Sequence, residues 1–148
     1  MLLPKPEVGL VVHYGFVWAG ADRRTPPDAG KSRPCLIVDL ENAAESSLGK
    51  RPLTRVTYLP ISHTEPQAGN HAIPIPARVA DHLGLTSKQS YLYTSYAVED
   101  DWPFDLEQVP GSRRFAYGLI PPRLFTMVAK SFADFLATHP LAVHKRSE

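Results

Sequence analysis

Three polar residues, each within three positions of a proline, carry side chains suited to phosphate and proton chemistry. Arg33 precedes Pro34 at the expected start of a strand, and its guanidinium offers a planar fork of donors that matches phosphate oxygens. Ser62 and His63 follow a Pro-Ile pair; the hydroxyl can bond a phosphate oxygen, and the imidazole, with an unperturbed pKa of roughly 6.5, can accept or donate a proton. Each residue type also has an ordinary role, as an exposed arginine, a turn serine or a solvated loop histidine. The residues alone leave both roles open.

A second group of candidates combines aromatic rings with cations, as the binding of single-stranded nucleic acid requires. The group consists of Tyr14, Trp18, Arg23, Arg24, Lys31 and Trp102. Tyr14 and Trp18 share one face of the expected first strand, where aromatic residues more often form a core or a subunit interface. Trp102 follows three acidic residues and precedes a proline, so its ring either contacts a base or pins its loop to the domain. The three cations belong to the loop at 19–32.

The histidine and cysteine spacings argue against a metal site. His63, His71 and His82 are separated by eight and eleven residues, which matches no common ligand pattern, and no pair of cysteines accompanies them. The single cysteine, Cys35, lies in an apolar strand, where a thiol is normally a small buried hydrophobe. We therefore expect neither a metal nor another cofactor.

Composition indicates an ordinary globular protein. Of the 148 residues, 43% are hydrophobic and 21% are charged, which is far from the composition of disordered chains. No apolar run approaches the roughly 18 residues that cross a bilayer, and no secretory signal is recognisable. We expect a cytoplasmic protein that does not enter a membrane. The net charge of +1 does not by itself indicate a nucleic-acid partner, although the cations at 19–32 can form a local basic site.

Prolines and glycines separate short β-rich runs, a pattern typical of all-β domains with many turns. The expected strands cover residues 9–18, 34–40, 53–60, 72–76, 91–98 and 113–120. Apolar residues at helical spacing predict a short helix at 77–83, which ends at Gly84, and an amphipathic C-terminal helix at about 122–137.

No repeat or linker divides the chain, so we expect one domain over residues 1–148 with its core at about 9–137. Two loops, at 19–32 and 41–52, are long enough to carry function, and the first is the better candidate. The chain after Leu141 is expected to be a frayed tail.

Four segments follow one another in a particular order: Gly9-Leu-Val-Val-His-Tyr-Gly-Phe-Val-Trp18, Lys31-Ser-Arg-Pro-Cys-Leu-Ile-Val38, Leu59-Pro-Ile-Ser-His63 and Tyr117-Gly-Leu-Ile-Pro121. Together they resemble the MazF/PemK toxin family of type II toxin–antitoxin systems, in which Arg-Pro begins a hydrophobic strand and a later strand ends in a Pro-x-Thr turn. The resemblance covers about residues 9–135 and is nearest to a PemK-like branch. Ser62 replaces the threonine of that turn and keeps the hydroxyl, whereas residues 98–102 lack an asparagine that the family has near the tryptophan.

The resemblance implies a mainly β fold, a small antiparallel SH3-like barrel, and a sequence-selective endoribonuclease that cuts single-stranded RNA without a metal. In such a reaction a ribose 2′-hydroxyl attacks the adjacent phosphate, and the protein supplies charge stabilisation, a proton acceptor and a proton donor. Arg33 would stabilise charge, because a guanidinium stays protonated and is a poor base. Ser62 would bond a phosphate oxygen, and His63 would act as general acid or base.

The resemblance also implies partners. It describes a toxin that inhibits translation and growth, forms a homodimer, and is neutralised by a cognate antitoxin protein whose disordered acidic segment occupies the RNA groove. Two other functions stay open. One is a catalytically silent SH3-like module that binds nucleic acid or a peptide, which the near-neutral charge favours. The other is a structural or regulatory protein that lost its substrate contacts, as the acidic segment at 99–101 suggests.

Overall fold

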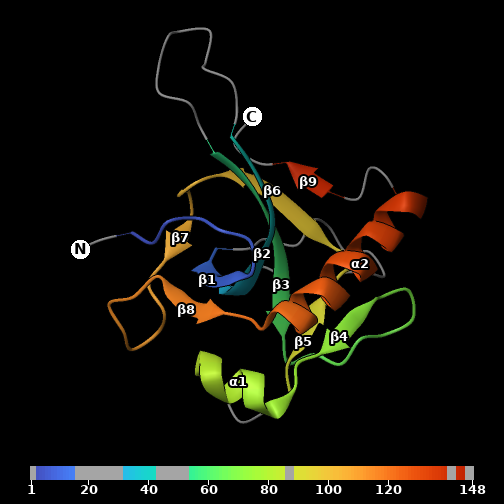
Figure 1. Cartoon of the computed structure of the whole chain (residues 1–148), viewed down its shortest axis with the longest axis horizontal. Coiled ribbons are helices and arrows are strands. Elements are labelled where there is room, and N and C mark those ends of the chain that lie inside the picture. Colours follow the sequence, from blue (N-terminus) through green and yellow to red (C-terminus); the bar gives the residue numbers. More distant parts are fainter. Residues whose placement is uncertain (1–2, 16–31, 43–53, 86–88, 140–142, 146–148) are drawn as a thin grey trace, which may run out of the picture.

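Nine strands and two helices make up the parts of the chain that the computed structural model describes, residues 3–15, 32–42, 54–85, 89–139 and 143–145 (Figure 1). The strands are β1 (Leu10–Tyr14), β2 (Arg33–Asn42), β3 (Thr54–Ser62), β4 (Ala72–Pro74), β5 (Tyr91–Tyr93), β6 (Ala97–Asp101), β7 (Leu106–Glu107), β8 (Ala116–Leu119) and β9 (Val143–Lys145). The helices are α1 (Ala77–Leu83) and α2 (Pro122–Thr138). The prediction of a mainly β protein with a short and a C-terminal helix is confirmed.

All nine strands belong to one sheet, in which β1 to β8 pair antiparallel and β9 pairs parallel with β6. The main path runs β4-β5-β3-β2-β1-β7, with β6 added beside β3 and β8 beside β1. The first half of β3 pairs with β6 and its last two residues pair with β5, so the sheet forks along this strand. Among the described residues no ladder joins the two ends of the path. The sheet is therefore open, and closure into the expected barrel is not observed.

Alternate residues of the strands contribute to two separate cores, as the period of two in a β-strand requires. The cross-strand partners Val11 and Leu36 belong to one hydrophobic cluster, whereas the next pair, Val12 and Cys35, belongs to the other. The first cluster also contains buried side chains from α1 and α2, and Figure 1 shows α2 crossing this face of the sheet. A one-residue shift of a strand would move the side chains of one cluster to the position of the other, and this fixes the register of the strands.

Both helices occupy the predicted positions. Helix α1 ends at Gly84, whose φ of 72° is the left-handed conformation that glycine adopts without strain. Helix α2 begins with a proline in its first turn, and its buried residues Leu124, Val128 and Phe132 repeat every four positions. Met127, at the flank of this stripe, is 57% exposed. Neither helix within the described ranges is long and apolar enough to span a membrane.

Three β elements differ from the predicted pattern. The run at 91–98 is divided into β5 and β6, because the chain between them bonds to His71: the Thr94 amide donates to the His71 carbonyl at 2.8 Å, and the Ser95 hydroxyl accepts from the His71 amide at 3.0 Å. The two-residue β7 was not predicted. The expected frayed tail is also wrong in part, since β9 pairs with β6 and Val143 packs against the first cluster.

Candidate functional site

A pocket of about 390 Å³ lies where the ends of several strands meet the end of α1. Its wall contains all three residues for which the sequence suggested catalysis: Arg33, Ser62 and His63. Its other polar members are His13, Ser32, Ser90 and Tyr117, and apolar surface comes from Pro34, Ile61, Leu85, Val109 and Pro110. Residues from β1, β2, β3 and β8 therefore converge at one place, although they are far apart in the sequence.

Arg33 begins β2, where it stands opposite Tyr14 of β1, and it is 4% exposed. Its carbonyl accepts a hydrogen bond from the Cys35 thiol, with the sulfur and oxygen 3.6 Å apart. Burial raises the pKa of Cys35 well above its usual range, and the positive charge of Arg33 only partly opposes this. Cys35 is thus the expected buried thiol without thiolate character.

Ser62 and His63 lie at the end of β3. The Ser62 hydroxyl accepts a hydrogen bond from the Thr64 amide at 3.0 Å, so the ordinary turn role of this serine is present beside its place in the pocket wall. His63 is exposed, and its Nδ1 lies 3.3 Å from both the Gln89 carbonyl oxygen and the Ser90 hydroxyl. The segment that leads into β5 therefore positions the imidazole at the pocket.

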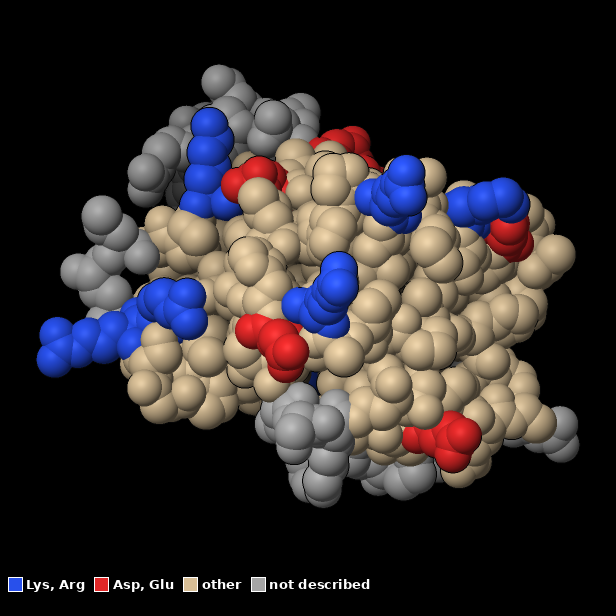
Figure 2. Space-filling model, turned by 60° about the horizontal axis from the view of Figure 1, so that its bottom comes forward, with Lys and Arg blue, Asp and Glu red and all other residues tan. Residues whose placement is uncertain are grey.

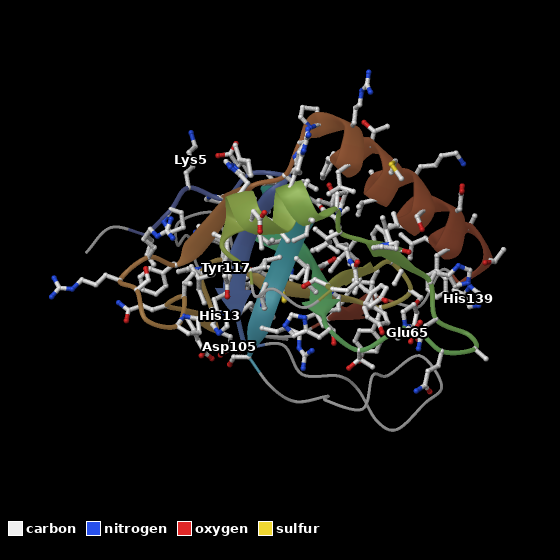
Figure 3. The ribbon with its side chains drawn as sticks, turned by 90° about the horizontal axis from the view of Figure 1, so that it is seen from below. Lys5, His13, Glu65, Asp105, Tyr117 and His139 are labelled. Atoms are coloured by element: carbon white, nitrogen blue, oxygen red, sulfur yellow. The ribbon has the colours of Figure 1, made fainter. Side chains whose placement is uncertain are left out.

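His13 is a site residue that the sequence analysis missed. It lies on β1, is 7% exposed, and its Nδ1 is 2.8 Å from the Tyr117 hydroxyl on neighbouring β8; Figure 3 shows the two side chains next to each other. Burial lowers the pKa of His13, and Glu107, opposite it on β7, opposes the shift. Burial raises the pKa of Tyr117 to about 12. The signal in the sequence was a polar residue that interrupts the apolar run of the first strand.

The structure describes two of the proposed substrate-binding residues, Tyr14 and Trp102, and both belong to or pack against the second hydrophobic cluster. Tyr14 has no exposed surface, its ring stacks on Tyr58 at 4.1 Å, and its hydroxyl donates to Asp100 at 2.5 Å. Its expected contact with a base is therefore corrected to a core position. Trp102 is half-buried against the second cluster and does not line the pocket, which matches its alternative role of pinning a loop. Trp18, Arg23, Arg24 and Lys31 lie outside the described residues.

The acidic segment before Trp102 makes internal contacts. Arg55 on β3 donates to Glu99 at 3.1 Å and to Asp101 at 2.7 Å, across the β3–β6 ladder. Asp100 is fully buried and accepts from both Tyr14 and the Asp101 amide. These carboxylates hold β6 to its neighbours. No group of three or more His, Cys, Asp or Glu within the described ranges is placed to hold a metal.

Positive and negative side chains are interspersed on the face of the molecule that Figure 2 shows, where several Lys or Arg side chains lie beside Asp or Glu. Comparison of the chain with family models, with characterised proteins and with solved structures finds no match. The chemistry of the pocket therefore carries the functional argument.

Proposed function

We propose that this protein is a metal-independent endoribonuclease of the toxin type, and that the pocket lined by His13, Arg33, Ser62 and His63 is its active site. The observation that carries the proposal is the meeting of these four side chains in one cavity. Two imidazoles, a guanidinium and a hydroxyl supply a proton acceptor, a proton donor and phosphate ligands without a metal ion.

The proposed reaction breaks one bond to phosphorus for the one that it forms. The ribose 2′-oxygen forms a bond to phosphorus while the bond from phosphorus to the 5′-oxygen breaks, giving a 2′,3′-cyclic phosphate and a 5′-hydroxyl. The proton of the 2′-hydroxyl passes to a base, and the departing 5′-oxygen receives a proton from an acid. Arg33 and Ser62 face the charge that develops on the phosphoryl oxygens.

His13 suits the part of the base. Its lowered pKa keeps the imidazole neutral at pH values where an ordinary histidine is partly charged, and only a neutral ring accepts a proton. When Nδ1–H donates to the Tyr117 oxygen, Nε2 carries the lone pair. His63, which is exposed just after the end of β3, then provides the proton for the leaving oxygen.

The wider biological role rests on the resemblance to the MazF/PemK toxins. On this basis the protein is a cytoplasmic toxin that cuts messenger RNA, works as a homodimer with an SH3-like barrel in each subunit, and is inhibited by an antitoxin. The open antiparallel sheet with a C-terminal helix is compatible with a strongly curved, barrel-like arrangement.

A second candidate function is a silent binding module for nucleic acid or a peptide. The burial of Arg33 favours it, because an arginine residue that is 4% exposed has little surface to offer a phosphate unless the pocket opens. Under this alternative the same residues would hold a ligand without breaking a bond.

One experiment separates the two candidates. Purified protein is incubated with a long single-stranded RNA in excess chelator, and the new ends are mapped and tested for cyclic phosphate and 5′-hydroxyl groups. We expect cleavage by the wild type and by Arg78→Ala, an exposed control outside the pocket, and none by His13→Ala combined with His63→Ala. Binding of the RNA without any wild-type cleavage would favour the silent module, and activity that depends on added metal would exclude the mechanism.

A further inference from the structure

A second hollow adjoins the candidate active site. It has a volume of about 810 Å³ and lies between the N-terminal segment, represented by Leu3 and Pro4, and the chain that connects β7 to β8. Arg113 and Arg114 in its wall are exposed, and Phe115 and Tyr117 beside them are half-buried. None of the described residues that line it is acidic.

The hollow and the active-site pocket share one wall residue, Tyr117, and the connection at 109–115 contributes Val109 and Pro110 to the pocket and the two arginines to the hollow. A polymer that is seated at His13 and follows this shared wall would pass Tyr117 and reach Arg113 and Arg114. In Figure 1 this connection and the N-terminal segment lie on the same side of the sheet, next to β7 and β8.

The connection between β7 and β8 is held in place by its own hydrogen bonds. The Val109 amide donates to the Arg114 carbonyl at 2.7 Å, the Ser112 amide donates to the Val109 carbonyl at 3.0 Å, and the Ser112 hydroxyl accepts from the Arg114 amide at 2.8 Å. Gly111 provides the positive φ, 75°, that this tight turn needs. The backbone that carries the two arginines is thus organised before a ligand arrives, which lowers the entropic cost of binding.

We propose that Arg113 and Arg114 bind backbone phosphates of single-stranded RNA next to the cleaved bond, and that Phe115 and Tyr117 offer ring surface to its bases. The combination of fixed cations with aromatic rings matches a single-stranded nucleic acid better than an acidic peptide, which would satisfy the arginines and leave the rings unused. This inference rests on the proposed function, because it takes the polymer in the pocket to be RNA.

The test measures binding separately from cleavage. Fluorescence anisotropy is recorded with RNA whose 2′-hydroxyls are methylated, as a trinucleotide and as an oligonucleotide of about ten residues, within the usual site size for single strands. The variant Arg113→Ala/Arg114→Ala is compared with wild type and with Arg78→Ala/Arg123→Ala, which removes two exposed arginines outside both cavities. Circular dichroism checks that each variant is folded.

We expect the Arg113→Ala/Arg114→Ala variant to bind the longer RNA roughly tenfold or more weakly than wild type, and the trinucleotide equally well. The dependence of log affinity on log salt should fall in slope by about 1.4, since each phosphate contact on a single strand contributes about 0.7. The control variant should keep wild-type affinity and slope.

Three results would overturn the inference: unchanged binding of the longer RNA by the Arg113→Ala/Arg114→Ala variant, an equal loss in the control variant, or binding of an acidic peptide at this surface with no binding of RNA. Arginine-dependent binding of RNA that wild type never cleaves would instead support the inference and count against the proposed nuclease activity. The two failures are therefore distinguishable.

Discussion

The Nδ1 atom of His13 lies 2.8 Å from the hydroxyl oxygen of Tyr117, a contact between residues 104 positions apart in the chain. The antiparallel pairing of β1 with β8 brings them together, and both side chains belong to the pocket wall. Because burial raises the pKa of Tyr117 to about 12, the phenol keeps its proton and can hold the imidazole ring in one orientation without adding charge. Tyr117 is in this respect a positioning residue for His13.

Replacement of Tyr117 by phenylalanine tests this role. The variant keeps the half-buried ring but loses the partner of the buried His13 imidazole, so we expect RNA cleavage to fall about tenfold and the melting temperature to fall only slightly, with the protein still folded in the assay. Single-turnover cleavage and a thermal melt measure both effects, and the pH profile of the rate should change as well. Tyr91→Phe, half-buried but outside the pocket, is the matched control. A wild-type rate and pH profile in Tyr117→Phe would exclude the positioning role.

Glu107 provides a second test, because its negative charge raises the pKa of His13 against the larger effect of burial. Glu107→Gln should move this pKa further below the ordinary value of 6.5. Since the neutral imidazole is the proton acceptor in the proposed mechanism, the acidic limb of the rate profile should shift toward lower pH by the same amount. NMR titration of the ring and kcat/KM against pH measure the two quantities, with exposed Glu41→Gln as control. A shift to higher pH would contradict the electrostatic argument.

Local sequence signals were sufficient for the helices and less so for the strands. The glycine after α1 and the prolines before α2 act through backbone conformation, which is a property of the residue itself, so both helices lie where they were predicted. The division between β5 and β6 depends on hydrogen bonds to His71, more than twenty residues earlier in the chain. Strand β9 likewise exists through pairing with β6, and neither contact is visible in a local pattern.

The residues of the site also differ in how far local sequence could identify them. Arg33, Ser62 and His63 were selected because their segments resemble the MazF/PemK toxins and their side chains suit phosphate and proton chemistry, and the structure brings them into one pocket. For Tyr14 the sequence favoured a core or interface position over contact with a base, and the structure places it in the core; its partner Asp100, 86 residues away, is not visible in a local pattern. His13 was missed because its place in the site depends on the contact with Tyr117, which is far away in the sequence. The sequence of the first strand shows only a polar residue that interrupts an apolar run.

Tyr14→Phe separates a core role from a role in RNA binding. The substitution leaves the buried Asp100 carboxylate without the hydroxyl that donates to it at 2.5 Å, so we expect the free energy of unfolding to fall by about 1–3 kcal/mol. RNA affinity of the folded protein should not change, because the ring has no exposed surface. Urea denaturation and anisotropy with RNA measure the two properties. Weaker RNA binding at an unchanged free energy of unfolding would show that Tyr14 contacts RNA and would contradict the core role.

Arg33→Ala tests the charge stabilisation on which the proposed mechanism depends most. If the guanidinium faces the developing charge on the phosphoryl oxygens, its removal should lower the cleavage rate by about 10²-fold or more, as the loss of a preorganised donor does in other enzymes. Arg33→Lys should recover only part of the rate, because an ammonium cannot reproduce the two parallel hydrogen bonds of a guanidinium. His63→Ala should instead remove the fall of the rate on the alkaline side of a profile recorded between about pH 5 and 8, since it removes the proposed general acid, whereas the acidic limb set by His13 should remain.

The measurement is cleavage of one RNA by folded wild type and the three variants across this pH range, with Arg78→Ala as the control for loss of an exposed positive charge. Because Arg33 is 4% exposed, each variant is first compared with wild type by thermal melting, so that a lost fold is not mistaken for lost catalysis. Full activity in folded Arg33→Ala would remove Arg33 from the mechanism, and an unchanged pH profile in His63→Ala would limit His63 to positioning the RNA. A rate that falls equally in Arg33→Ala and Arg78→Ala would attribute the effect to overall charge, whereas a fall confined to Arg33→Ala assigns it to the pocket.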